Sequence, residues 1–282
     1  MARAGRGFHA FVLFLLVLAT GCATDPSGPH ITGTTTIATF HASDFGFEGP
    51  DRLPAGQTVV RLVNHGQQPH HIQLVKLTDG MNLDQLVEAL QAPVVQMPNW
   101  AKHMGGPNGI GPGGRAEATL FLEPGSYALL CTIPTTDRQP HITLGMYKAL
   151  TVVEQGDRPQ SFAANYHLSL RDYEVAVIEP MTAGLHSFYV KNRGTQVHQV
   201  SLVRLNPGAS DGHVAAALAP ASDLPSWPWQ LAGGMTGLEP GGEGVFTAML
   251  ASGRYSLICL FPNPNTPQSH AAKGMVLTFE VP

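Results

Sequence analysis

Two stretches of the chain decide the fold: Arg61–Leu77, RLVNHGQQPHHIQLVKL, and Tyr189–Leu205, YVKNRGTQVHQVSLVRL. Each contains the frame Asn-x-Gly-x3-His, followed by an apolar-alternating segment that ends in Leu. The two stretches lie 128 residues apart and differ at most other positions. A frame that recurs between otherwise divergent stretches indicates an internal repeat.

A second pair of stretches continues the repeat downstream. Gly105–Cys131 reads GGPNGIGPGGRAEATLFLEPGSYALLC, and Gly233–Cys259 reads GGMTGLEPGGEGVFTAMLASGRYSLIC. After each Cys, a Pro-rich loop ends in His, four further residues and Met. A duplicated domain explains this pattern, and we place the two copies at residues 32–155 and 162–282. The polar, turn-prone segment QGDRPQS at 155–161 is the expected linker.

Composition and local patterns predict an all-β fold. Charged residues make up only 13% of the chain, whereas Gly (31) and Pro (23) are plentiful. Short apolar-alternating or β-branched segments bounded by Gly, Pro or Asn predict strands at Thr58–Val63, Ile72–Leu77, Ala118–Leu122, Tyr127–Cys131, Ala149–Val153, Ser187–Val190, Val200–Leu205, Val245–Met249, Tyr255–Leu260 and Val276–Val281. Each copy has one short helical insertion, at Asn82–Gln91 and at Asp211–Ala219. We therefore expect two tandem Greek-key β-sandwiches.

The repeated His, Cys and Met residues predict a metal site in each copy. A type 1 copper site needs two imidazole nitrogens and a thiolate in a near-trigonal plane, with a weak axial thioether. A lone buried Cys or Met is more often a core residue, but four such ligands in the same order twice favour metal binding. The predicted ligand sets are His70, Cys131, His141 and Met146 in the first copy, and His198, Cys259, His270 and Met275 in the second. His71 is an alternative to His70, although alignment with the second copy favours His70. A disulfide between Cys131 and Cys259 would require two domain interiors to meet, so metal ligation is the preferred use of both.

The segment Asn64-His65-Gly66…Pro69-His70-His71-Ile72 resembles the upstream-histidine segment of plastocyanin-type cupredoxins. The pattern Gly-x-Tyr-x3-Cys and the Cys-loop-His-x4-Met end are similar to the copper-cysteine strand and loop of the same superfamily. This resemblance covers nearly the whole chain after its first residues and implies a β-sandwich, mononuclear copper and one-electron transfer. It also implies that the electron leaves through His141 or His270. The Cys-to-His gaps, ten and eleven residues, are longer than in the smallest cupredoxins, and Val197 replaces the Pro before His198.

The residue before each Cys argues against an enzyme. Copper nitrite reductases and multicopper oxidases place His immediately before the copper Cys, but this chain has Leu130 and Ile258 there. We therefore expect a non-catalytic electron carrier with copper in one or both copies. The alternatives are a protein that buffers or delivers copper, and a metal-free binding or structural module. No basic run predicts nucleic-acid binding and no motif predicts a small-molecule substrate, so the expected partner is a redox protein that the sequence does not identify.

The first residues predict export. Arg3 and Arg6 precede an apolar core, FVLFLLVL at 11–18, which is too short to span a bilayer comfortably. The following Leu18-Ala19-Thr20-Gly21-Cys22 resembles the bacterial lipobox, in which cleavage before Cys exposes the thiol for acylation. We therefore predict a signal peptide at 1–21, lipidation of Cys22 and a tether at 22–31. Ala23 in place of Asp favours the periplasmic side of the outer membrane if the cell has two membranes.

Overall fold

The structure is a computed structural model that describes residues 1, 35–91, 97–155, 162–177, 179–219, 227–264, 266 and 268–282. Apart from Met1, the predicted signal peptide and the tether with Cys22 lie outside the described residues, as does 156–161 of the predicted linker. Contacts group Gly33–Pro282 into one compact unit. In the part of the chain that is described, no helix has the length and apolar character needed to cross a membrane.

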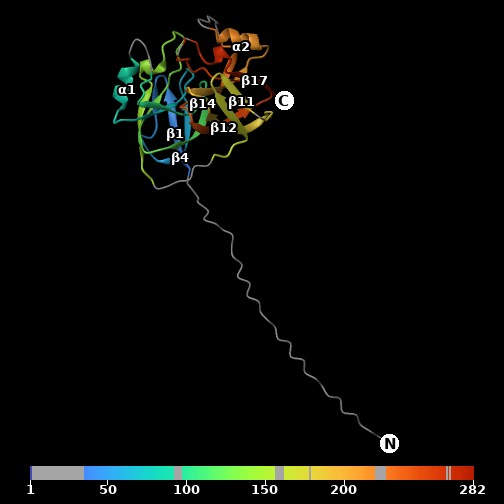
Figure 1. The fold of residues 1–282 in the computed structure, drawn as a ribbon, viewed down its shortest axis with the longest axis horizontal. Helices are drawn as coiled ribbons and strands as arrows, with labels where there is room; N and C mark the ends of the chain where they lie inside the picture. Colours follow the sequence, from blue (N-terminus) through green and yellow to red (C-terminus); the bar gives the residue numbers. More distant parts are fainter. Residues whose placement is uncertain are drawn as a thin grey trace. The chain divides into compact units, whose positions relative to one another are not determined.

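The described residues form two β-sheets, which confirms the all-β prediction (Figure 1). The eight-stranded sheet has the order β11 (Glu174–Val177), β10 (Tyr166–Arg171), β12 (Gly184–Asn192), β15 (Glu243–Leu250), β7 (Arg115–Leu122), β4 (Gly56–Asn64), β1 (Thr36–Ser43) and β2 (Gly46–Glu48). The nine-stranded sheet has the order β17 (Val276–Val281), β16 (Gly253–Ile258), β13 (His198–Leu205), β14 (Trp229–Leu238), β6 (Ala101–Gly105), β5 (Gln73–Leu77), β8 (Gly125–Leu130), β9 (Tyr147–Val153) and β3 (Arg52–Pro54).

Each sheet contains strands from both halves of the chain, and the pairing repeats between the halves. β1 pairs in parallel with β4, and the equivalent β10 pairs in parallel with β12; β1 and β4 lie side by side at the blue end of the chain (Figure 1). The halves meet where β7 pairs with β15 in one sheet and where β6 pairs with β14 in the other. The fold is thus two similar halves, related by the repeat, that share both sheets. The separate domain boundaries at 155 and 162 stay a prediction.

A continuous apolar core explains why these strands form. The inward positions of β4 alternate with half-buried ones along its whole length, as expected for a strand with one face in the core. The largest fully buried side chains are aromatic: Phe40 and Tyr127 in the first half, and Phe188, Phe246 and Tyr255 in the second. Cys131, Met146, Cys259 and Met275 belong to the same cluster, so both predicted sites border one shared core.

The two helical insertions are present and cover the nine-stranded sheet. α1 (Leu83–Leu90) begins at Asn82, whose side chain and that of Gln85 cap each other's backbone N–H groups. α2 (Asp211–Ala217) begins in the same way at Ser210. Their buried residues pack on strand residues of this sheet in two clusters separate from the main core.

Candidate metal centres

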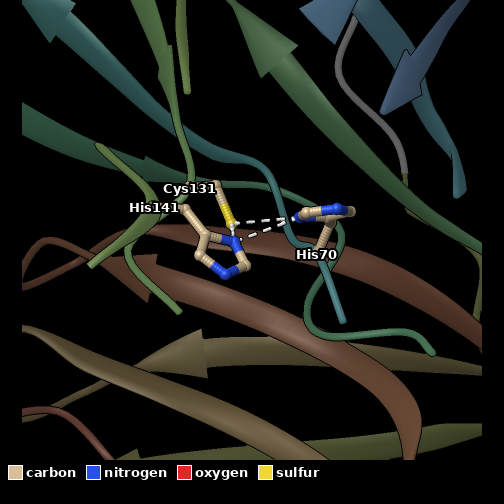
Figure 2. Close-up of side chains that lie close together, drawn as sticks. All are labelled: His70, Cys131 and His141. Atoms are coloured by element: carbon tan, nitrogen blue, oxygen red, sulfur yellow. Dashed lines mark hydrogen bonds between the residues drawn. The ribbon is translucent and has the colours of Figure 1, made fainter. Parts of the chain in front are cut away.

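Three ligand atoms converge in the first half, from segments far apart in the sequence. His70 lies in the connection from β4 to β5, Cys131 follows the last residue of β8, and His141 begins a short 3-10 helix, His141–Leu144. The Nδ1 atoms of the two histidines lie 3.1 Å apart, and Cys131 Sγ lies 3.9 Å from His70 Nδ1 and 3.4 Å from His141 Nδ1. Figure 2 shows the sulfur and both rings directed at one another. All three residues are buried.

The second half repeats this arrangement. His198 begins β13, Cys259 follows β16, and His270 precedes the 3-10 helix Ala271–Lys273. The two Nδ1 atoms lie 3.0 Å apart, and Cys259 Sγ lies 3.9 Å from His198 Nδ1 and 3.6 Å from His270 Nδ1. In each half the ligand atoms all lie within 4.8 Å of one another. Two independent segments of sequence therefore build the same three-donor cluster.

Asp44 and its equivalent Asp172 determine which nitrogen each upstream histidine offers. Asp44 Oδ1 lies 2.6 Å from His70 Nε2, and Asp172 Oδ1 lies 2.8 Å from His198 Nε2. Burial opposes ionisation of Asp172, but hydrogen bonds from Thr195, His198 and the Gln196 N–H lower its pKa to about 2. Similar hydrogen bonds outweigh burial at Asp44 and lower its pKa. Because an ionised carboxylate only accepts hydrogen bonds, Nε2 of each histidine donates and the lone pair remains on Nδ1.

Gln68 and its equivalent Gln196 fix the other two histidines. Gln68 Oε1 accepts a hydrogen bond from His141 Nε2 at 3.2 Å, and Gln196 Oε1 accepts one from His270 Nε2 at 3.1 Å. The amide nitrogen of Gln196 donates to Tyr173 Oη at 3.2 Å, which orients its oxygen toward the ring. His141 and His270 therefore also present their Nδ1 lone pairs to the cluster.

Burial keeps the metal-free donors neutral. It raises the pKa of the Cys131 thiol to about 12 and that of the Cys259 thiol to about 11, against the effect of nearby backbone N–H groups. Burial also lowers the pKa of His70 and His141, and burial together with His198 lowers that of His270 to about 4. Without a metal, each cluster therefore places two imidazole lone pairs and one thiol sulfur against one another. The thiol proton is the one proton available for a hydrogen bond among these three atoms, so the lone pairs repel each other. A bound cation would turn this repulsion into attraction and hold the sulfur as thiolate.

The backbone also brings the predicted methionines to the sites. Met146 and Met275 are fully buried. Cys131 N–H donates to Met146 O at 3.1 Å, and Cys259 N–H donates to Met275 O at 3.1 Å. Each Met therefore neighbours the Cys of its own half. That their sulfur atoms are axial ligands stays a prediction.

His71, the alternative to His70, lies outside the cluster. Its Nε2 accepts a hydrogen bond from the Thr132 N–H at 2.9 Å. Its backbone N–H lowers the pKa of the Cys131 thiol against the larger effect of burial, and the equivalent Gln199 N–H donates to the sulfur of Cys259 at 3.5 Å. His71 thus supports the Cys sulfur through its backbone, and the structure brings His70 to the site as the spacing favoured. Both Cys131 and Cys259 are free thiols, as expected.

A glycine makes room for each Asp–His pair. A Cβ on Gly66 would lie 2.3 Å from Asp44 Oδ1 and 2.6 Å from His70 Nε2, and a Cβ on Gly194 would meet Asp172 and His198 at similar distances. Asn64 shapes this loop, because its side chain accepts from the Gly66 N–H and donates to Gln68 O. The repeated Asn-x-Gly-x3-His frame is therefore a structural requirement of the site.

The two sites differ in the residues that cover the loop histidine. The ring of Phe45 lies 4.8 Å from that of His141, whereas Tyr173 takes the equivalent place, 5.5 Å from His270. Lys273 stands 5.8 Å over the Tyr173 ring and lowers the pKa of His270. The residue equivalent to Lys273 in the first half is Leu144. The second site thus has a positive charge near its loop histidine at a position where the first site has the uncharged Leu144.

The donor set fits copper. One thiolate and two imidazole nitrogens, with a buried thioether residue alongside, form the combination typical of type 1 copper, whereas Mg²⁺ and Ca²⁺ prefer oxygen ligands. Sequence reasoning found these donors but missed Asp44, Asp172, Gln68 and Gln196. The signal was present, because both pairs recur at the 128-residue offset of the ligands.

Several solved structures that are similar to this chain are copper proteins. No family model matches the sequence, and no curated protein matches it either. Auracyanin from Roseiflexus castenholzii is 24% identical over 43% of this chain and 98% of its own, with a TM-score of 0.31. A blue copper oxidase and a copper nitrite reductase from Nitrosomonas europaea are 14% and 13% identical over 88% of this chain and 86% and 94% of their own, with TM-scores of 0.28 and 0.27.

Proposed function

We propose that this protein is a type 1 copper protein that carries single electrons, with one copper in each half. His70, Cys131 and His141 would hold one ion, and His198, Cys259 and His270 the other, with Met146 and Met275 as axial ligands. The copper would supply a one-electron change between Cu(I) and Cu(II). The observation that carries the proposal is the pair of clusters in which carboxylates and amides direct every imidazole lone pair at a buried thiol.

Rigid ligands suit this role. The second nitrogen of every ligand imidazole is fixed by Asp or Gln, and nearby backbone N–H groups lower the pKa of each Cys thiol against the larger effect of burial. A site that is held in place by its surroundings changes little between oxidation states, so electron transfer requires little rearrangement. The loop histidines are buried, and their outer nitrogens bond to half-buried Gln68 and Gln196. We therefore propose that electrons leave through these glutamines as well as the rings.

We further propose that the protein is not an enzyme. A second copper next to the first would need a histidine beside each Cys, and these positions hold Leu130 and Ile258. Both side chains are buried in the apolar clusters under α1 and α2, away from the ligand side of the strand. The partner would be another redox protein.

The test is copper loading of residues 23–282. Titration with one and then two equivalents of Cu(II) is expected to give an intense thiolate-to-copper absorption and the narrow hyperfine splitting of type 1 copper in electron paramagnetic resonance. Cys131→Ser and Cys259→Ser should each remove half of the signal. Colourless protein with both thiols still titratable would contradict the proposal and leave a metal-free module. Colourless protein that takes up Cu(I) tightly would indicate copper buffering or delivery instead.

We propose that acylated Cys22 anchors the protein to the cell envelope. The support is the lipobox-like sequence at 18–22 after an apolar core. Labelled palmitate should be incorporated into the wild-type protein and not into Cys22→Ser. Labelling of both proteins, or of neither, would contradict lipidation at this residue.

A further inference from the structure

Asn108 lies buried where the two halves meet. Its side-chain nitrogen donates to Val200 O and Ser201 Oγ, both at 3.1 Å and both in the second half. Its backbone N–H donates to Gly234 O at 3.1 Å, also in the second half. One residue of the first half is thus bonded to β13, which begins with His198 of the second site, and to its neighbour β14.

A short run of bonds leads from Asn108 to the sulfur of the second site. Val200, which accepts from Asn108, directly follows Gln199 in the chain. The backbone N–H of Gln199 points at Cys259 Sγ, at 3.5 Å. The side chain of Gln199 also donates to Ser201 Oγ at 3.3 Å, so two of the three acceptors of the Asn108 side chain connect to the same residue.

A second run leads from Asn108 to Cys131 of the first site. Pro107, the residue before Asn108, accepts a hydrogen bond from the Ile72 N–H at 3.0 Å. Ile72 directly follows His71, whose ring accepts a hydrogen bond at 2.9 Å from the backbone N–H of Thr132, the residue after Cys131. Covalent and hydrogen bonds therefore connect Cys131 and Cys259, and the residues at the junction itself, Ile72, Pro107, Asn108 and Val200, are buried.

The same bonds occur in the reverse direction. Thr236, the equivalent of Asn108 in the second half, donates through Oγ1 to Ile72 O at 3.0 Å and through its backbone N–H to Gly106 O at 2.9 Å. The junction thus contains two crossed connections, one through Asn108 and one through Thr236. Both join the segment that supports one Cys sulfur to the segment that supports the other.

We propose that Asn108, assisted by Thr236, couples the two copper sites electronically, so that an electron received at one site passes to the other inside the molecule. This inference rests on the proposed function. Electronic coupling decays more slowly along covalent and hydrogen bonds than across gaps between side chains, and the residues of the path at the junction lie in the interior. In each transfer one electron leaves a Cu(I), which becomes Cu(II), and reaches a Cu(II), which becomes Cu(I). No bond or proton changes place.

The test is one-electron reduction of the doubly loaded protein by pulse radiolysis. Absorption of the two sites is assigned beforehand from Cys131→Ser and Cys259→Ser. Wild type should show a fast reduction followed by a relaxation between the sites whose rate is independent of protein concentration. Asn108→Ala should slow that relaxation at least tenfold, and Thr236→Val should slow it less. The control Glu239→Ala, which removes other hydrogen bonds between the halves, should leave the rate unchanged.

Absorption and electron paramagnetic resonance spectra of each variant separate the possible outcomes. Normal spectra at both sites with an unchanged rate in Asn108→Ala and Thr236→Val would overturn the coupling and leave the proposed function standing. A relaxation that scales with protein concentration would overturn it in the same way, because the transfer would be between molecules. Absence of a type 1 spectrum in wild type would overturn both. If Asn108→Ala does not fold, Thr236→Val, which replaces a hydroxyl by a methyl group of similar size, decides the question.

Discussion

At the scale of single residues, the carboxylates of Asp44 and Asp172 orient the upstream histidine of each site. Each carboxylate holds one histidine in the tautomer that leaves Nδ1 free, and each also accepts backbone N–H bonds from the loop that carries this histidine. A carboxylate bonded to a ligand imidazole makes the ring a stronger donor. Such a carboxylate therefore stabilises Cu(II) relative to Cu(I).

Asp44→Asn is expected to weaken copper binding at the first site alone. The amide keeps an oxygen that can accept from His70 but removes the negative charge, so the affinity for Cu(II) should fall about 10–100-fold. The reduction potential of this site should rise. Competition titrations and spectroelectrochemistry measure both quantities. Asp172→Asn is the matched control and should shift only the second site, and equal shifts of both sites in either variant would contradict this role.

Lys273 predicts that the two sites differ in reduction potential. A positive charge near a metal favours its less positive oxidation state, so the second site should have the higher reduction potential. When the protein holds one electron for its two copper ions, that electron should therefore reside at the second site. Lys273→Leu should lower the potential of the second site, and Leu144→Lys should raise that of the first. Because both positions are exposed, these shifts should shrink as salt is added. Spectroelectrochemical titration at low and high salt measures them, and a salt-independent difference would show that Lys273 is not its source.

Residue identity was the part of the site that the sequence predicted best. The ligands were recognisable because His, Cys and Met recur in the same order at the same spacing. Asp44 and Gln68 recur equally well, but Asp and Gln are common on surfaces and in loops. Their importance depends on which ring nitrogen they face, which only the folded backbone decides.

At the scale of elements, the connection from β4 to β5 is shaped around the Asp–His pair. Gly66→Ala would place a methyl group against both Asp44 Oδ1 and His70 Nε2. We expect a loss of stability of about 1–3 kcal/mol, as for other overpacked buried positions, and loss of copper binding at the first site. Thermal unfolding and copper titration measure the two effects. Gly111→Ala is the control, because a Cβ there meets no atom within 4 Å, and equal effects of the two variants would contradict the argument.

The elements themselves were predictable where alternation was regular. All ten predicted strands and both helical insertions are present, with ends shifted by a few residues. Seven strands of the described residues were not predicted: β1, β2, β3, β6, β10, β11 and β14. Of these, β6 and β14 were missed because each contains or ends at a Gly-Gly pair, which interrupts alternation and resembles a turn. In the structure these glycines allow close approach to the neighbouring strand: a Cβ on Gly234 would lie 2.1 Å from Val200 O. The pairing of β13 with β14 shifts register on both sides of this contact.

At the scale of the whole molecule, the two halves share both β-sheets, which the sequence repeat did not predict. Three residue pairs connect β7 with β15, and a single pair connects β6 with β14, yet these few pairs make both sheets continuous. A repeat in the sequence predicts two similar units but says nothing about which edges meet. Side chains such as Asn108 and Gln73 stabilise the pairing of these edges, because they form hydrogen bonds across the junction. Both differ from the residues at the equivalent positions of the other half.

Glu239 makes the junction sensitive to acid. Its Oε1 accepts from the backbone N–H of His103 at 3.0 Å and from His103 Nδ1 at 3.2 Å, across the contact between β14 and β6. Burial opposes ionisation of Glu239, but these hydrogen bonds outweigh it and lower its pKa. A carboxyl group whose pKa is lower in the folded state stabilises the fold above its ordinary pKa, and this contribution is lost as the pH falls through the folded value. The window of loss therefore lies below about pH 4.5.

Glu239→Gln is expected to remove this acid sensitivity. The amide can still accept the same hydrogen bonds but has no charge to lose, so the variant should be less stable than wild type at pH 7 and approach it as the pH falls. Because the group is partly exposed, we expect a difference of about 1 kcal/mol, or about 2–4 °C in Tm for a protein of this size. Thermal unfolding of the metal-free protein from pH 7 to pH 3.5 measures it. Other carboxylates titrate in the same window, so the decisive quantity is the gap between the two curves: a gap that closes with acid supports the role of Glu239 at the junction, and parallel curves contradict it.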